Sequence, residues 1–181
     1  MTNLKRTIVT SMLIALCVVL PMAFHSIPRA GSIILPMHIP VLLAGLICGW
    51  KFGLVAGLAG PLLSSYMTSM PPMGIVPIMM LELGVYGLIS GVMIQIVFTK
   101  RSSLDLYISL ITAMFFGRVI AGIAMAVYFF DGAYYMGLWV SSYFITSLPG
   151  IVIQLAFVPS VVMALEREQI IPLRYPVRLS L

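Results

Sequence analysis

Charged side chains are scarce in this chain. Only 8% of its 181 residues are Asp, Glu, Lys or Arg, whereas 61% are hydrophobic. A soluble domain usually carries roughly 25% charged residues, and the mean hydropathy here is +1.14. A water-soluble fold of this length could not hide so much apolar surface. The scarcity of charge therefore excludes a soluble protein and indicates one whose solvent is lipid.

Cysteine is also scarce, and common catalytic motifs are missing. Cys17 and Cys48 lie in separate apolar segments without the spacing of metal ligands, so we expect them to be inert packing residues. The sequence contains no G-x-x-x-x-G-K-[ST], no H-E-x-x-H, no G-x-S-x-G and no paired aspartates. We therefore predict no catalytic residues, no metal, no cofactor and no ATP hydrolysis by this chain.

The net charge of +5 does not indicate a nucleic-acid-binding face. Eight of the ten basic residues fall at the termini or in two short breaks between apolar runs: Lys5, Arg6, Lys51, Lys100, Arg101, Arg167, Arg174 and Arg178. Arg29 lies in another break, and Arg118 lies inside an apolar run. This distribution is typical of a membrane protein with positively charged cytoplasmic loops.

A helix needs about 20 residues to cross the bilayer, and the long apolar runs predict six transmembrane helices, of which the second is short. We place them at about 7–24, 39–48, 52–70, 75–98, 104–130 and 136–165, with Gly49-Trp50-Lys51 separating the second from the third. The apolar stretch after Lys5-Arg6 lacks a convincing cleavage site, so we count it as a helix rather than a signal peptide. The fold class is an all-α membrane protein, with residues 1–181 forming one transmembrane domain.

Six spans place both termini on the same side of the membrane. Eight basic residues lie on that side and only Arg29 lies on the other. The positive-inside rule then predicts cytoplasmic termini for a multi-pass protein of the cell membrane.

Two ionisable residues, Glu82 and Arg118, lie inside predicted spans at depths that the long Arg side chain can bridge. Charged groups within a bilayer usually face the bundle interior and mark a functional site. One interpretation is a polar floor for a captured solute. The alternative is a salt bridge that only locks two helices together.

Neighbouring polar groups favour the solute interpretation. Tyr86 is four residues after Glu82 and therefore shares its helix face. In the last span, a stripe of polar and small residues recurs at helical spacing: Trp139, Tyr143, Ser147, Gly150 and Gln154. Trp139 could equally be an interfacial aromatic residue, and Gln154 a helix–helix hydrogen-bonding residue. His38 could close over a ligand at the mouth of the second span, or serve as a cap.

Small residues four apart allow helices to approach closely. They occur at Gly45 and Gly49, at Gly53 and Gly57, and at Gly87 and Gly91, where we expect packing within the chain. The pair Ser11 and Ala15 in the first span could instead receive another subunit.

Several of these motifs resemble the substrate-binding S components of energy-coupling factor (ECF) transporters. The likeness covers nearly the whole chain and includes the six-span plan. Ser11-Met-Leu-Ile-Ala15 resembles that family's Ala-x-x-x-Ala surface, with Ser in place of the first Ala. The other motifs are His38-Ile-Pro-Val-Leu-Leu-Ala-Gly45, Gly53-Leu-Val-Ala-Gly57, Pro61-Leu-Leu-Ser64, Met70-Pro-Pro-Met73 and Glu82-Leu-x-x-Tyr86-Gly-Leu-Ile-Ser-Gly91.

The resemblance implies an ATP-driven importer with three partners: a membrane coupling subunit and two ATPase subunits. It implies a vitamin pocket that includes Glu82, Tyr86, Arg118, Tyr143 and Ser147, with His38 at a lid. The pattern is most similar to the members for pyridoxine or hydroxymethylpyrimidine, then to those for pantothenate. Two other hypotheses remain at this point, a membrane scaffold with a structural Glu82–Arg118 pair and a small lipid-modifying enzyme.

Overall fold

The fold was determined as a computed structural model, which describes residues 1–24, 30–128, 136–172 and 174–175. These residues form helices and no strands. The elements are α1 (Asn3–Ala23), α2 (Ala30–Ile34), α3 (His38–Leu43), the π-helical turn η1 (Ala44–Cys48), α4 (Trp50–Thr68), the 3-10 turn η2 (Met73–Ile75), α5 (Val76–Ile96), α6 (Ser102–Tyr128), α7 (Met136–Val140), the π-helical turn η3 (Ser141–Thr146) and α8 (Leu148–Arg167).

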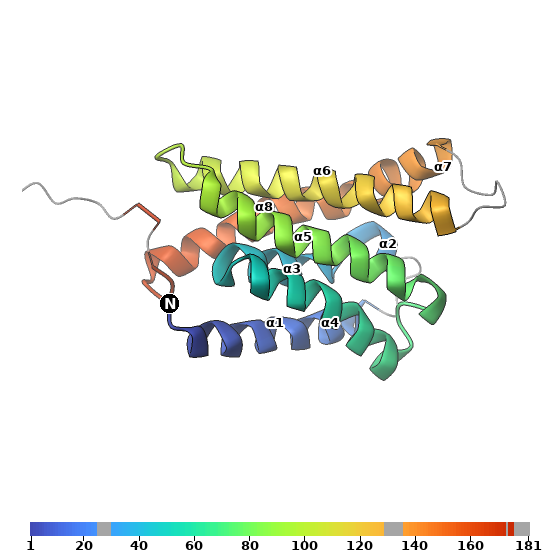
Figure 1. The fold of residues 1–181 in the computed structure, drawn as a ribbon, viewed down its shortest axis with the longest axis horizontal. Helices are drawn as coiled ribbons and strands as arrows, with labels where there is room; N and C mark the ends of the chain where they lie inside the picture. The colour runs from blue at the N-terminus through green and yellow to red at the C-terminus, as the bar shows by residue number, and fades with distance from the viewer. Residues whose placement is uncertain (25–29, 129–135, 173, 176–181) are drawn as a thin grey trace, which may run out of the picture.

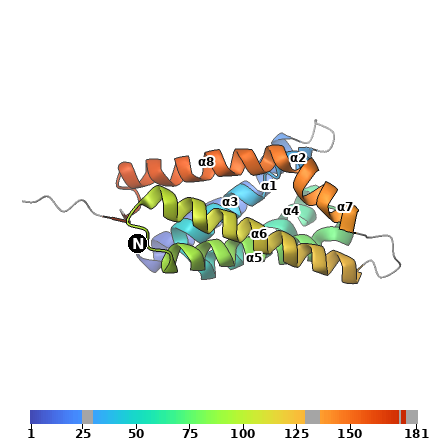
Figure 2. The ribbon, with the colours of Figure 1, turned by 90° about the horizontal axis from the view of Figure 1, so that it is seen from above.

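The long helices lie side by side in one bundle. In Figure 1, α1 and α6 form opposite edges, with α3 and α5 between them. Figure 2 shows α8 along one side and α5 with α6 along the other. The start of α1 and the end of α8 lie at the same end of the bundle, where Lys5 Nζ donates a hydrogen bond of 2.8 Å to the carbonyl oxygen of Ile170. The short helices α2 and α7 lie at the opposite end.

Five segments of the described chain are long and apolar enough to cross a membrane: Asn3–Ala23, Gly31–Cys48, Met73–Ile96, Ser102–Val127 and Leu148–Arg167. Helix α4 corresponds to the remaining predicted span and has 19 residues. Its three glycines, two serines and Lys51 make it less apolar than the other segments. The predicted break before it is confirmed, because Gly49 has a φ of 97° that favours glycine.

The last predicted span is not one continuous helix. Instead, α7 runs into η3, and a new helix, α8, begins after Ser147. Pro149 lies in the first turn of α8, where its missing N–H group costs no hydrogen bond. The π-helical turn adds a residue to the turn before that break. Side chains on either side of Ser147 therefore do not continue one straight stripe.

Helices α4 and α5 are in close contact through glycine. A Cβ atom built on Gly53 would lie 2.3 Å from the carbonyl oxygen of Gly87, and one built on Gly87 would lie 2.1 Å from the carbonyl oxygen of Gly53. Both obstacles are backbone atoms, which cannot rotate away. The expected role of the small-residue motifs in these two helices, packing within the chain, is thus confirmed.

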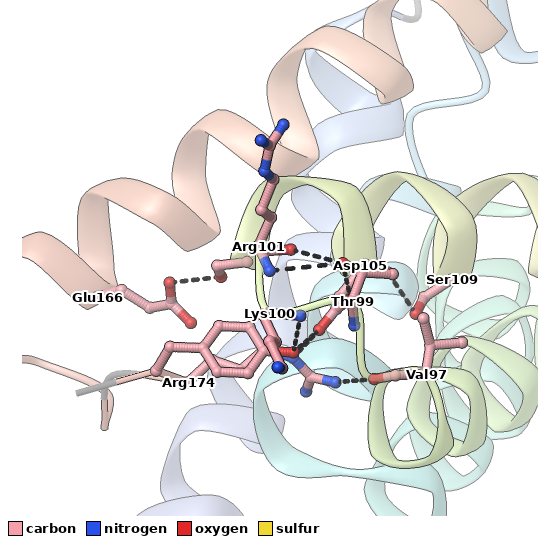
Figure 3. Close-up of polar contacts among 10 residues, drawn as sticks. Val97, Thr99, Lys100, Arg101, Asp105, Ser109, Glu166 and Arg174 are labelled. Atoms are coloured by element: carbon pink, nitrogen blue, oxygen red, sulfur yellow. Dashed lines mark hydrogen bonds and ion pairs between the residues drawn. The ribbon is translucent and has the colours of Figure 1, made fainter. Parts of the chain in front are cut away.

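A polar cluster lies at the end of the bundle where α1 begins and α8 ends (Figure 3). The Asp105 side chain is fully buried in the first turn of α6. It accepts hydrogen bonds from the backbone N–H and the hydroxyl of Thr99, at 2.9 and 2.6 Å, and from the Tyr175 hydroxyl. The Arg174 Nε atom completes its partners at 2.5 Å. These contacts fasten the segment after α8 to the α5–α6 connection.

Gly87→Ala should destabilise the bundle by about 1–3 kcal/mol, because the added methyl group meets the backbone of α4. Thermal unfolding of the purified chain in detergent measures this as a lower melting temperature. Gly74→Ala is the matched control, since a Cβ atom there meets no atom within 4 Å. Equal melting temperatures for the two variants would contradict the close α4–α5 contact.

Asp105→Asn should lower the unfolding free energy by about 2 kcal/mol, because the charge-assisted bonds to Arg174 weaken inside a buried site. Glu168→Gln removes the same charge at an exposed position near the end of α8 and serves as the control. Denaturation of both variants in the same detergent gives the comparison. A loss no larger than that of the control would show that the cluster does not fasten the two segments.

Candidate functional site

A cavity of about 160 Å³ lies where α5, α6 and the turn η3 meet the residues of α2. It is lined by Ser32, Leu35, Glu82, Arg118, Ser142, Tyr143 and Ser147. Glu82, Arg118 and Ser147 are buried, with 7%, 2% and 3% of their surface exposed. Ser32 and Ser142 are exposed. The cavity thus has a charged, buried floor and a mouth that carries hydroxyl groups.

Arg118 on α6 is held by hydrogen bonds to two other parts of the bundle. Its Nε atom donates to the Tyr86 hydroxyl on α5, and its Nη1 atom donates to the Ser147 hydroxyl, both at 2.9 Å. The guanidinium also lies 5.5 Å from the ring centroid of Phe144, within the range of a cation–π contact. A buried arginine in an apolar bundle needs such partners.

Trp139 forms a hydrogen bond with the backbone of Arg118. Its indole Nε1 donates a hydrogen bond of 3.2 Å to the Arg118 carbonyl oxygen. Two glycines of α6 make room for the aromatic rings around Arg118. A Cβ atom on Gly117 would lie 2.3 Å from the Tyr86 ring, and one on Gly122 would lie 2.2 Å from the Trp139 nitrogen. Glycine at these two positions of α6 therefore lets the Tyr86 and Trp139 rings pack beside Arg118.

Glu82 lies against His38 rather than against Arg118. The distance from His38 Nε2 to Glu82 Oε1 is 3.5 Å, and the imidazole lies edge-on to the Tyr86 ring at 5.0 Å between centroids. His38 is buried, with 2% of its surface exposed, and does not line the cavity. The sequence leaves His38 either to close over a ligand or to serve as a cap, and the structure places it against Glu82, outside the cavity lining.

The direct Glu82–Arg118 salt bridge, which the sequence left as an alternative, is not formed. Among the described side chains, the Glu82 carboxylate lies 3.5 Å from His38 Nε2 without a hydrogen bond, and Arg118 has its hydrogen bonds with hydroxyl groups. Both charged residues nevertheless line the same cavity. Glu82 and Arg118 therefore form the polar floor of the cavity without a salt bridge that joins α5 to α6.

The structure brings two members of the predicted stripe on the last span to the cavity and two others elsewhere. Tyr143 and Ser147 line the cavity. Trp139 contacts the arginine backbone instead, and Gln154 is buried in α8 away from the cavity lining. The π-helical turn and the break at Ser147 explain this, because they rotate α7 and α8 relative to one another.

Three lining residues were not predicted: Ser32, Leu35 and Ser142. Ser32 lies in α2, a short helix in the connection between the first two predicted spans. Ser142 is adjacent to Tyr143, so a straight helix would turn it to another face. Residues 25–29 of this connection lie outside the described part of the chain, as do residues 129–135 between α6 and α7.

The chemistry that these residues offer is binding. The cavity presents one carboxylate, one guanidinium and four hydroxyl groups. Within the described chain, no group of three His, Cys, Asp or Glu residues could hold a metal ion. These donors and acceptors can orient a small polar solute.

A separate surface lies on α1. Ser11 and Ala15 are both exposed, next to the exposed apolar side chains of Met12 and Leu16. Unlike the glycine motifs of α4 and α5, this small-residue pair is not covered by another helix of the described chain. It is therefore available to the surroundings of the bundle.

Comparison with known proteins gives one match. The family model described as "ECF transporter, substrate-specific component" matches residues 5–162, which covers every cavity-lining residue. No curated protein and no solved structure matches the chain.

Proposed function

Because the chain belongs to the family of ECF transporter substrate-specific components, we propose that it captures a small water-soluble vitamin or vitamin precursor in the Arg118 cavity. Members of this family are membrane-embedded transport subunits, not enzymes, and they associate with the membrane ECF module and its ATPases. The lipid-modifying enzyme hypothesis is thereby excluded. The candidate solutes are pyridoxine, hydroxymethylpyrimidine and pantothenate.

The observation that carries this proposal is the cavity itself. A carboxylate and a guanidinium are buried beside one another in a bundle with few charges, yet they do not neutralise each other by direct contact. Burial of charged groups is costly, and a scaffold would gain nothing from two separate charges at a cavity. A bound solute gives both groups a partner.

We assign two roles to the residues around the cavity. Glu82, Arg118, Tyr143 and Ser147 contact the solute, because they line the space. Three further residues fix these groups in position. Tyr86 and Trp139 form hydrogen bonds with Arg118, and His38 contacts Glu82.

In the membrane, we propose six spans with α4 as the third and one domain across residues 1–181. Lys5, Lys51, Lys100 and Arg101 lie at helix ends near the start of α1, which is the end we place in the cytoplasm of the cell. The cavity then faces the outer half of the cell membrane. The coupling subunit docks on Ser11 and Ala15 of α1, and the two ATPase subunits act through it.

The capture function predicts a clear thermal shift. A vitamin present at 100 times its Kd should stabilise the purified chain by about 2.7 kcal/mol, which is roughly 5–10 °C for a chain of this size. Glu82→Ala and Arg118→Ala should remove the shift, whereas Glu168→Ala, at an exposed site, should keep it. Normal binding by both cavity variants would contradict the cavity assignment.

The docking role of α1 predicts a separate effect. Ala15→Trp should block co-purification with the coupling and ATPase subunits, because the bulky ring prevents close helix contact. Its vitamin-induced thermal shift should be unchanged. Ile123→Trp places the same ring at an exposed position of α6 and should assemble normally. Normal assembly of Ala15→Trp would remove this face from the interface.

A further inference from the structure

We propose that the solute bound beside Arg118 is a small monocarboxylate, recognised through its carboxylate by the Arg118 guanidinium. This inference rests on the proposed capture function and deepens it by naming the chemical class. It reorders the candidates that the sequence suggested, because pantothenate carries a carboxylate, whereas pyridoxine and hydroxymethylpyrimidine do not.

The first argument is the charge of the cavity floor. Both hydrogen-bond partners of Arg118 are neutral hydroxyl groups, those of Tyr86 and Ser147. Of the carboxylates that the structure describes, none forms an ion pair with Arg118: Glu82 lies against His38, and Asp105 pairs with Arg174 at the far end of α6. A buried cation without a carboxylate in direct contact is costly, and an anionic ligand beside it lowers that cost.

The second argument is the number of donors that remain. A guanidinium has five N–H donors, and the bonds to Tyr86 and Ser147 use two of them. Arg118 lines the cavity together with the hydroxyl-bearing side chains of Ser142 and Tyr143. Charge-assisted bonds from guanidinium to carboxylate are among the strongest in proteins and are often bidentate. The hydroxyl groups of the wall can add weaker donors.

The third argument concerns Glu82, which limits the charge of the ligand. A dianionic phosphate in a cavity of about 160 Å³ would lie close to this carboxylate and be repelled by it. A single carboxylate can also pair with Arg118, and it carries half the charge of the phosphate, so Glu82 repels it less. The rest of the ligand then needs hydroxyl or N–H groups that can donate to Glu82. The cavity therefore selects a ligand with one carboxylate, which pairs with Arg118, and with hydroxyl or N–H groups, which donate to Glu82.

The test uses pairs of compounds that differ only at the acidic group: pantothenate and panthenol, nicotinate and nicotinamide, and 4-pyridoxate and pyridoxine. Binding to the purified full-length chain in detergent is measured by thermal shift and calorimetry. We expect at least one acid to bind on the order of 100-fold more tightly than its neutral partner, because the neutral analogue leaves the guanidinium without its anion. This comparison uses the wild-type chain and requires no variant to fold.

Variants then assign the preference to Arg118. Arg118→Gln should reduce the affinity for the acid to that for its neutral partner. Arg118→Lys keeps the positive charge but loses the planar fork, so it should retain a preference about tenfold smaller than that of the wild type. A preference for the acid that persists unchanged in Arg118→Gln would overturn the assignment.

Two results would overturn the monocarboxylate and separate it from the proposed function. If a neutral compound binds tightly and its acid does not, capture of a vitamin stands and the carboxylate class is wrong. If none of the six compounds binds at millimolar concentration, the carboxylate class is again wrong, and thermal shifts with other water-soluble vitamins and precursors, hydroxymethylpyrimidine among them, judge the capture function on its own.

Discussion

The structure depends on one requirement, that a guanidinium buried in an apolar bundle must be surrounded by partners. Arg118 meets it with the Tyr86 hydroxyl from α5, the Ser147 hydroxyl before α8 and the face of Phe144 in η3. These contacts draw three segments, distant in the sequence, around one point. None of these partners carries a negative charge, so the bundle holds the arginine in place without neutralising it. That combination supports the proposal that the cavity binds a solute.

The remainder of the bundle keeps this site rigid. Glycine contacts between α4 and α5 bring their backbones together, which fixes the helix that carries Glu82 and Tyr86. At the other end, Asp105 ties the start of α6 to the segment after α8. Helix α1 differs, since its small residues Ser11 and Ala15 remain exposed. This division between a packed cavity region and an exposed face on α1 fits the proposed roles of solute capture and partner docking.

The sequence predicted those parts that follow from the cost of burial or from helix geometry. Glu82 and Arg118 were found because charge is rare in a membrane, and Tyr86 because it lies one turn from Glu82. The position of Trp139 outside the cavity lining was not predicted, because no local signal marks the π-helical turn η3, which ends the straight stripe. The His38–Glu82 contact joins two helices, so only tertiary packing reveals it. Ser32 and Ser142 are hydroxyl residues of a kind that is common in loops, and their place at the cavity depends on the same packing.

The central claim is that the Arg118 cavity holds a solute, and native mass spectrometry of the chain extracted gently from its own membrane tests it most directly. The account predicts that one small acidic molecule is released from the wild-type chain and that none is released from Arg118→Gln prepared in the same way. Release of only phospholipid from both proteins would contradict the claim, because the cavity would then be a lipid-filled gap. Release of the same small molecule from both proteins would place its site away from Arg118.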